Sequence, residues 1–182
     1  MGNGSQFYRF IASLPHRMLL GVLLGLMVAG CAGYHLGPVN GEPAGSRSIE
    51  IKPFLNRTRE PGITAYVGNA LRKEVERDGT YRLETHVPGD IVVSGVITRY
   101  ERTELAYVPH QVITPQDYTL ILSAEVQAID RATGKRKFAG RITGQTAIRV
   151  LSDMSSSERQ AMPLLAEDLA RNLVSVLADG AW

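Results

Sequence analysis

The chain has 182 residues, of which 44% are hydrophobic and 21% are charged, with a formal net charge of +2. The first 30 residues contribute two of the 20 basic side chains and none of the 18 acidic ones, so the remaining 152 residues carry equal numbers of each. This composition suits one domain with a sizeable core, and it lacks the basic excess on which nucleic-acid binding depends.

The N-terminal segment has the three parts of an export signal. A polar stretch with Arg9 and Arg17 precedes an apolar run of 11 residues, 18–28, and small residues follow in "VAGC". The run is shorter than the roughly 20 residues that a membrane-spanning helix needs. This pattern predicts a signal peptide over residues 1–30, cleaved between Gly30 and Cys31.

Cys31 is the only cysteine in the sequence. The letters "VAGC" behind an apolar run resemble the lipobox of bacterial lipoproteins, in which the cysteine receives a diacylglycerol and its new amino group is acylated. A cysteine without a disulfide partner suits this modification, and several acyl chains anchor a protein more firmly than one chain. We therefore expect Cys31 to carry diacylglycerol and an N-acyl chain such as palmitate, and we expect no other cofactor. The alternative is a chance cysteine at the end of the signal.

The next elements are a tether, a strand and a helix. Residues 31–48 are rich in glycine and proline and have no hydrophobic period, which predicts a flexible tether before a domain over residues 49–180. A short alternating strand is expected at 48–54, followed by a helix from Ile63 to Arg77 that Asp78-Gly79 ends. The helix is indicated by one apolar stripe: Ile63, Val67, Ala70, Leu71 and Val75.

Three long extended segments follow, at residues 90–107, 117–130 and 135–150. The turn sequence "DRATGK" joins the last two as a hairpin. Alternating apolar and polar residues are typical of antiparallel sheets that have one face on a core and the other in water. The last segment has the clearest polar face, which we expect to contact water or a hydrophilic partner: Lys137, Arg141, Thr143, Gln145 and Arg149.

A second helix closes the domain. Ser155 and Glu158 have the spacing of a capping box, and apolar residues recur at helical spacing from Leu165 to Leu177. The order strand, helix, three strands, helix predicts an α+β fold. Because each apolar stripe must be buried, we expect a two-layer sandwich of two helices packed on one face of a mostly antiparallel four-stranded sheet.

The sequence contains no motif that predicts catalysis. A zinc site needs three or four ligands close together, and the histidines stand apart from other potential ligands. Gly-x-Ser-x-Gly and phosphate-binding loops are absent from the sequence. Glu167 and Asp168 lie near the exposed face of the last helix, where solvated carboxylates explain them better than an acid–base pair. We expect no metal site and no enzymatic activity.

Five blocks occur in an order that resembles the LptE family of lipopolysaccharide-assembly lipoproteins: "CAGYHL", "IEIKPFLNRTREPGI", "LRKEVERDGTYRL", "GDIVVSGVITRYE" and "AEVQAIDRATGKRKFAG". The resemblance extends from Cys31 to about Leu177 and implies two helices packed on a four-stranded sheet. It also implies a lipoprotein anchored in the outer membrane of a diderm bacterium, at the periplasmic face. Its implied role is to act as plug and assembly partner of the large β-barrel protein LptD in lipopolysaccharide transport to the outer leaflet.

A binder of lipid A phosphates needs a few well-placed cations. If the long strands alternate in direction, Arg102 and Arg149 lie as neighbours at one edge of the sheet, with His110 in the loop between strands. This topology makes the three residues candidate lipopolysaccharide contacts. The alternative is that they are ordinary surface residues.

Two other functions remain open at this point. A lipid-anchored protein of similar fold could be a structural component of another envelope assembly, in which case it would bind no barrel of the LptD type. A tethered envelope hydrolase is the second alternative. It would require a nucleophile or a carboxylate pair in a cleft, for which the sequence offers no good candidate.

Overall fold

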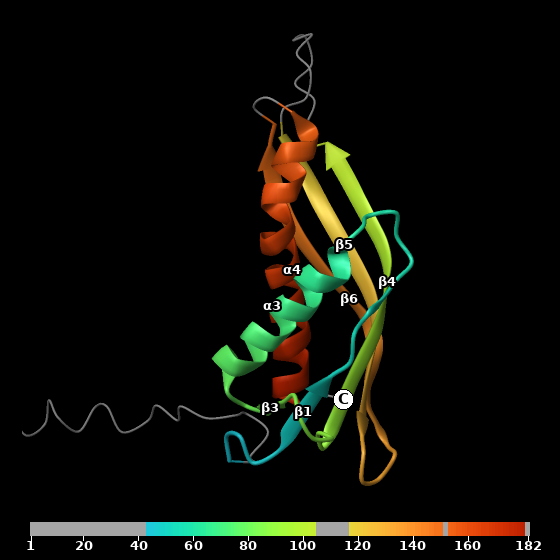
Figure 1. The fold of residues 1–182 in the computed structure, drawn as a ribbon, viewed down its shortest axis with the longest axis vertical. Helices are drawn as coiled ribbons and strands as arrows, with labels where there is room; N and C mark the ends of the chain where they lie inside the picture. The colour runs from blue at the N-terminus through green and yellow to red at the C-terminus, as the bar shows by residue number, and fades with distance from the viewer. Residues whose placement is uncertain (1–42, 105–116, 151–152, 181–182) are drawn as a thin grey trace, which may run out of the picture. The chain divides into compact units, whose positions relative to one another are not determined.

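The computed structural model describes residues 43–104, 117–150 and 153–180. The chain divides into two compact units, Met1–Leu36 and Gly37–Trp182, and all described residues belong to the second. Its helices and strands follow one another along the chain (Figure 1): β1 (Ser48–Ile51), β2 (Leu55–Asn56), α3 (Ile63–Asp78), β3 (Arg82–Glu84), β4 (Ile91–Glu104), β5 (Asp117–Asp130), β6 (Arg136–Arg149) and α4 (Met154–Asp179).

The strands form one mixed sheet in the order β3-β1-β4-β5-β6, and β2 pairs with β4 further along the edge that β1 occupies. β4, β5 and β6 are antiparallel neighbours over nearly their whole lengths. β1 is parallel to both β3 and β4. The pairing of β4 with β5 is interrupted by a bulge between Ile97 and Arg99, which leaves Thr98 without an opposite residue.

Helices α3 and α4 cover one face of this sheet, and α4 packs along β6 and against α3 (Figure 1). The apolar stripe expected on the first helix is buried in full, and the leucines of α4 are buried at the same helical spacing. The alternating apolar residues of β5 complete the core from the sheet side: Leu120, Leu122, Ala124, Val126 and Ala128. The expected α+β fold with two helices on one sheet is therefore confirmed.

The expected sheet of four strands is wrong in strand number, and the sheet is mixed, although its three long strands are antiparallel as expected. The short strands β2 and β3, of two and three residues, add to the sheet. Elements this short show no periodicity in a sequence, so their pairing depends on the neighbours that the fold supplies. The pairs that involve β1, β2 and β3 are all parallel, because α3 carries the chain over the sheet and returns it in the same direction.

The end of α3 agrees with the sequence prediction, whereas the start of α4 differs from it. Gly79 has a φ of 73° and donates its backbone N–H to the carbonyl oxygen of Val75 at 3.1 Å, which confirms the expected stop of α3. The expected capping box of Ser155 and Glu158 is wrong, because Asp153 caps α4 by accepting from the backbone N–H of Ser156 at 2.9 Å. Neither helix of the described ranges combines the length and apolar character needed to cross a membrane.

Candidate functional site

The sheet face opposite the helices is exposed along β4, β5 and β6. Strand alternation directs every second side chain of these strands to it, and neighbouring strands place those side chains in rows. Most of the residues on this open face are polar or charged: Ser94, Arg99, Glu101, Thr119, Ser123, Glu125, Gln127, Arg141, Thr143, Gln145 and Arg149. The polar face expected for the third long segment is therefore part of a surface that three strands share.

Charges on the open face are largely neutralised by one another. The Nε of Arg141 lies 2.9 Å from the Oε1 of Glu125 on the neighbouring strand. The Arg149 guanidinium makes two hydrogen bonds to Asp117, at 2.7 and 2.9 Å. These bonds lower the pKa of Asp117 and raise the pKa of Arg149. The face thus offers many hydrogen-bonding groups with little net charge.

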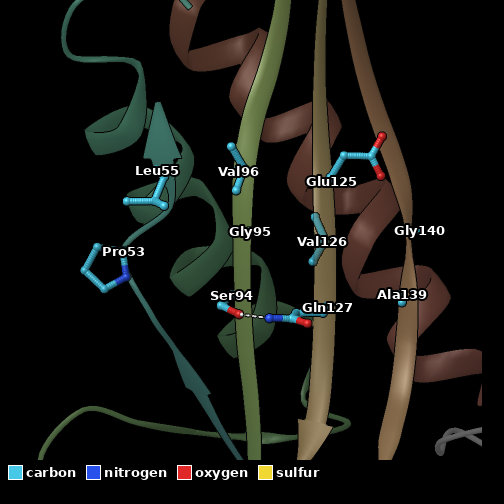
Figure 2. Close-up of a pocket in the computed structure, with 10 residues that line it drawn as sticks. All are labelled: Pro53, Leu55, Ser94, Gly95, Val96, Glu125, Val126, Gln127, Ala139 and Gly140. Atoms are coloured by element: carbon cyan, nitrogen blue, oxygen red, sulfur yellow. Dashed lines mark hydrogen bonds between the residues drawn. The ribbon is translucent and has the colours of Figure 1, made fainter. Parts of the chain in front are cut away.

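A shallow hollow of about 610 Å³ lies on the open face where β2 meets β4, β5 and β6 (Figure 2). Small residues, Ala139 and Gly140, form part of its lining, and Leu55 stands at its border with 65% of its surface exposed. Across the hollow, Gln127 donates a hydrogen bond to the Ser94 hydroxyl at 3.2 Å. An open hollow with an apolar border and hydrogen-bonding side chains suits the side chains of a partner rather than an enclosed substrate.

Arg102 faces the helices. Its Nη1 lies 3.1 Å from the Oε1 of Glu158 in the first turns of α4. Next to this pair, burial and then the nearby carboxylates of Glu158 and Glu60 raise the pKa of Tyr100 well above its ordinary value. With most of the Glu158 side chain buried, the Arg102–Glu158 pair ties β4 to α4 and is one of the more protected ion pairs described for this domain.

Arg102 and Arg149 lie toward the same end of the sheet but do not form one cluster. Arg102 is opposite Leu120 on the core face, whereas Arg149 is opposite Asp117 on the open face. β5 separates their strands, and each arginine is paired with its own carboxylate. The expectation that they are neighbours is therefore corrected. His110, Gly30 and Cys31 lie outside the described residues.

Two residues of α4 close the outer edge of β6: Asp168, which the sequence analysis expected to be a solvated carboxylate, and Asn172, which it did not single out. Asp168 accepts a hydrogen bond from the backbone N–H of Gln145 at 2.9 Å, and Asn172 donates to the carbonyl oxygen of Thr143 at 2.8 Å. Both side chains come from α4, so the helix supplies the hydrogen-bond partners that a further strand would otherwise give to the backbone of β6. The signal in the sequence is Gly144, a strand glycine at the point of closest approach.

The other carboxylate of the adjacent pair on α4, Glu167, forms an exposed ion pair with Lys73 of α3 at 2.7 Å. Lys73 lowers the pKa of Glu167. Asp168 and Glu167 are therefore engaged with two different elements, β6 and α3. No group of three His, Cys, Asp or Glu side chains within the described ranges is placed to hold a metal ion.

Comparison with known proteins relates most of the folded domain to one family. The family model LptE, described as lipopolysaccharide-assembly, matches residues 46–177. No curated protein sequence matches the chain significantly.

Two solved structures show the same fold at low sequence identity. The hypothetical protein CT253 from Chlamydia trachomatis has a TM-score of 0.52 and 12% identity, and the match covers 72% of this chain and 95% of that one. Protein XCC0632 from Xanthomonas campestris also has a TM-score of 0.52, with 11% identity over 80% of this chain and 91% of the other. At these identities the likeness extends to the fold alone.

Proposed function

Because the chain belongs to the LptE family of lipopolysaccharide-assembly proteins, we propose that it is an outer-membrane lipoprotein that binds a β-barrel partner of the LptD type. In this role it plugs the barrel, supports its assembly and assists the transport of lipopolysaccharide to the outer leaflet. The family match spans nearly all of the described domain, from before β1 to near the end of α4. The proposed activity is therefore binding, without catalysis.

The observation that carries the proposal is the open face of the sheet. The lumen of an outer-membrane barrel is polar, so a plug needs a surface rich in hydrogen-bonding groups. It also needs little net charge, because unpaired charges lose hydration when a partner covers them. The paired charges of Glu125 with Arg141 and of Asp117 with Arg149 meet this need. The hollow beside Leu55 offers a place for apolar side chains of the barrel wall.

A pull-down from native membranes in mild detergent tests the partner. Tagged protein is expected to bring down a large β-barrel protein in stoichiometric amount, identified by mass. Ala139→Trp fills the hollow and should reduce this recovery, whereas Ala65→Trp places the same bulk on the exposed surface of α3 and should not. Recovery without any barrel would assign the protein to another envelope assembly. Equal recovery with both variants would show that the open face is not the contact.

The lipid anchor has its own prediction. Cys31→Ser removes the thiol that would accept diacylglycerol, so the variant should lose the lipid mass and leave the membrane fraction. The domain lies beyond the anchor in sequence, so its circular dichroism should be unchanged. Intact-mass measurement and membrane fractionation check this. A Cys31→Ser protein that still carries lipid and sediments with membranes would contradict the proposed anchor.

Arg102, Arg149 and His110 remain our candidates for contact with lipopolysaccharide. Since Arg102 and Arg149 lie on opposite faces of the sheet, we propose that they act as separate contacts rather than as one phosphate site. Charge-removing variants at the two positions should then weaken lipopolysaccharide binding by independent factors. Binding of purified lipopolysaccharide to Arg102→Gln, Arg149→Gln and the double variant measures this additivity.

A further inference from the structure

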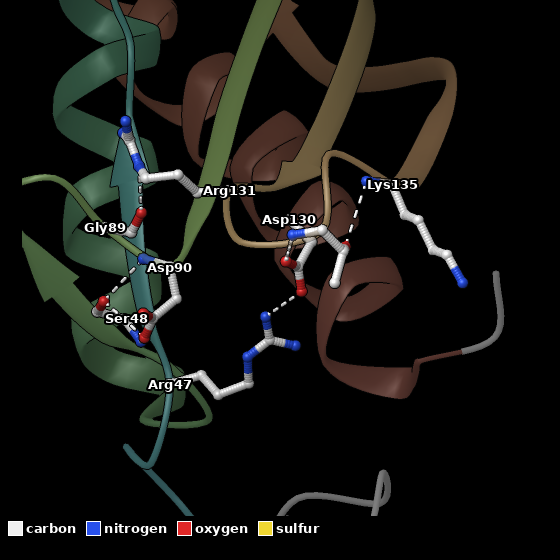
Figure 3. Close-up of polar contacts among 8 residues, drawn as sticks. Arg47, Ser48, Gly89, Asp90, Asp130, Arg131 and Lys135 are labelled. Carbon is white, nitrogen blue, oxygen red and sulfur yellow. Dashed lines mark hydrogen bonds and ion pairs between the residues drawn. The ribbon is translucent and has the colours of Figure 1, made fainter.

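The first residues of the domain are tied to the turn between β5 and β6 (Figure 3). The Nη2 of Arg47 lies 2.5 Å from the Oδ2 of Asp130, the last residue of β5. The other oxygen of Asp130 accepts from the backbone N–H of Thr133 at 3.0 Å, inside the turn. Beside them, the backbone N–H of Ser48 donates to Asp90 at 2.8 Å. The chain therefore enters the domain at a fixed point next to the β5–β6 turn.

Three cations at the end of this turn and the start of β6 are not matched by carboxylates. Lys135, Arg136 and Lys137 make no ion pair with any residue of the described ranges. Two carboxylates that contact this turn or end β5 before it are already engaged, since Asp130 binds Arg47 and Glu50 binds both Lys52 and Arg131. Figure 3 shows the Lys135 side chain extending away from this cluster. We call Lys135, Arg136 and Lys137 the basic turn.

The length of chain before the domain brings the basic turn within reach of a membrane. Cys31 and Pro43 are 12 residues apart in the sequence. A chain of this length spans at most about 40 Å, whatever its conformation. If Cys31 is acylated, as proposed above, the entry point of the domain and the adjacent basic turn stay close to the lipid headgroups.

From these observations we propose that the basic turn is a second membrane contact. It binds the anionic phospholipid headgroups of the leaflet in which Cys31 is anchored, and so orients the domain on that leaflet. Each cation near an anionic surface strengthens partitioning about fivefold, so three of them give roughly 100-fold. Without an acyl anchor this gives weak binding that an excess of vesicles detects, and in the lipidated protein it adds to an anchor that already holds the chain at the surface.

Flotation with lipid vesicles tests the contact without relying on lipidation or on a barrel partner. The mature chain with Cys31→Ser is mixed with vesicles of one part phosphatidylglycerol to three parts phosphatidylcholine, or of phosphatidylcholine alone. In this background, Lys135→Gln, Arg136→Gln and Lys137→Gln are combined in one variant. Arg57→Gln, Arg59→Gln and Arg99→Gln form a matched control, which removes the same charge from exposed residues beyond β2 and the β4 bulge.

The parent protein should bind the anionic vesicles and not the neutral ones, and added salt should weaken this binding. The basic-turn variant should lose roughly 100-fold in partitioning, while the control variant changes it by less than about fivefold. An equal loss in both variants would show that only net charge matters and would overturn the proposal. So would binding to neither kind of vesicle. Circular dichroism of each variant establishes that it is folded.

Discussion

Replacing Gly144 by alanine is expected to destabilise the domain by about 1–5 kcal/mol. Gly144 lies in β6 under α4, and a Cβ atom at this position would be 2.5 Å from the backbone N of Leu169 and 2.8 Å from the carbonyl oxygen of Leu165. Ordinary Cβ contacts begin at 3.4 Å, so α4 would have to move away from β6 by about 0.9 Å. Both obstacles are backbone atoms, which cannot rotate aside as a side chain can.

The magnitude combines two costs and one gain. Overpacking a tight contact costs about 1–3 kcal/mol. The same displacement stretches the hydrogen bonds that Asp168 and Asn172 make to β6, and each contributes about 0.5–1.5 kcal/mol. Against this, replacing glycine by alanine lowers the conformational entropy of the unfolded chain, which stabilises the folded domain by about 0.4–1 kcal/mol. The gain is smaller than the costs, so the net effect is a clear loss of stability.

Urea denaturation of the Cys31→Ser protein, followed by circular dichroism, measures this effect. Gly140→Ala is the matched control, because Gly140 lies in the same strand and the atoms nearest to its added Cβ would be those of the Phe138 ring, from 3.1 Å. A ring can shift by a few tenths of an ångström, so this variant should stay within about 1 kcal/mol of the parent. A loss below about 1 kcal/mol for Gly144→Ala, or equal losses for both variants, would refute the argument from close packing.

Two further predictions concern charged side chains. Hydrogen bonds from Thr133 and Arg47 lower the pKa of Asp130 from an ordinary 3.8 to about 2. Its carboxylate therefore adds stability above about pH 4 that is lost as the pH falls toward 2. The free energy of unfolding of Asp130→Asn should depend less on pH in this range than that of the parent protein. Equal acid sensitivity of the two proteins would contradict this. Lys73→Gln should change the free energy of unfolding by no more than about 0.5 kcal/mol, since its ion pair with Glu167 is exposed. A larger loss by urea denaturation would show that this pair bridges α3 and α4 more strongly.

The parts of the fold that the sequence predicted depend on local periodicity. The stripe from Ile63 to Val75 repeats every four residues, and the apolar residues of β5 alternate, so each pattern indicates its element without reference to the rest of the chain. The polar face of the sheet follows from the same alternation. The partners of β1, by contrast, are chosen by the path of the chain over the sheet, and a pairing of this kind leaves no periodic signal in either strand.

The closure of the β6 edge could not be predicted for a related reason. Asp168 is followed at helical spacing by the polar residues Arg171 and Asn172, which suggest an exposed position. Nothing in the nearby sequence indicates that its hydrogen-bond partner is a backbone N–H 23 residues earlier, that of Gln145. Its role depends on how closely α4 approaches β6, which Gly144 permits because it has no side chain. A glycine inside a strand thus marks the contact, although it does not identify the residues that complete it.

The position of Arg102 shows how one residue can reverse a prediction. Before the bulge, the odd-numbered residues of β4, such as Ile97, face the core, and unbroken alternation would put Arg102 on the open face with Arg149. Thr98 is the extra residue, so beyond it the even-numbered residues face the helices and Arg102 meets Glu158. The sequence contains a trace of this change, because the core residues Ile97 and Tyr100 are three apart instead of two. The bulge therefore decides whether this arginine belongs to the partner-facing surface or to the contact between sheet and helix.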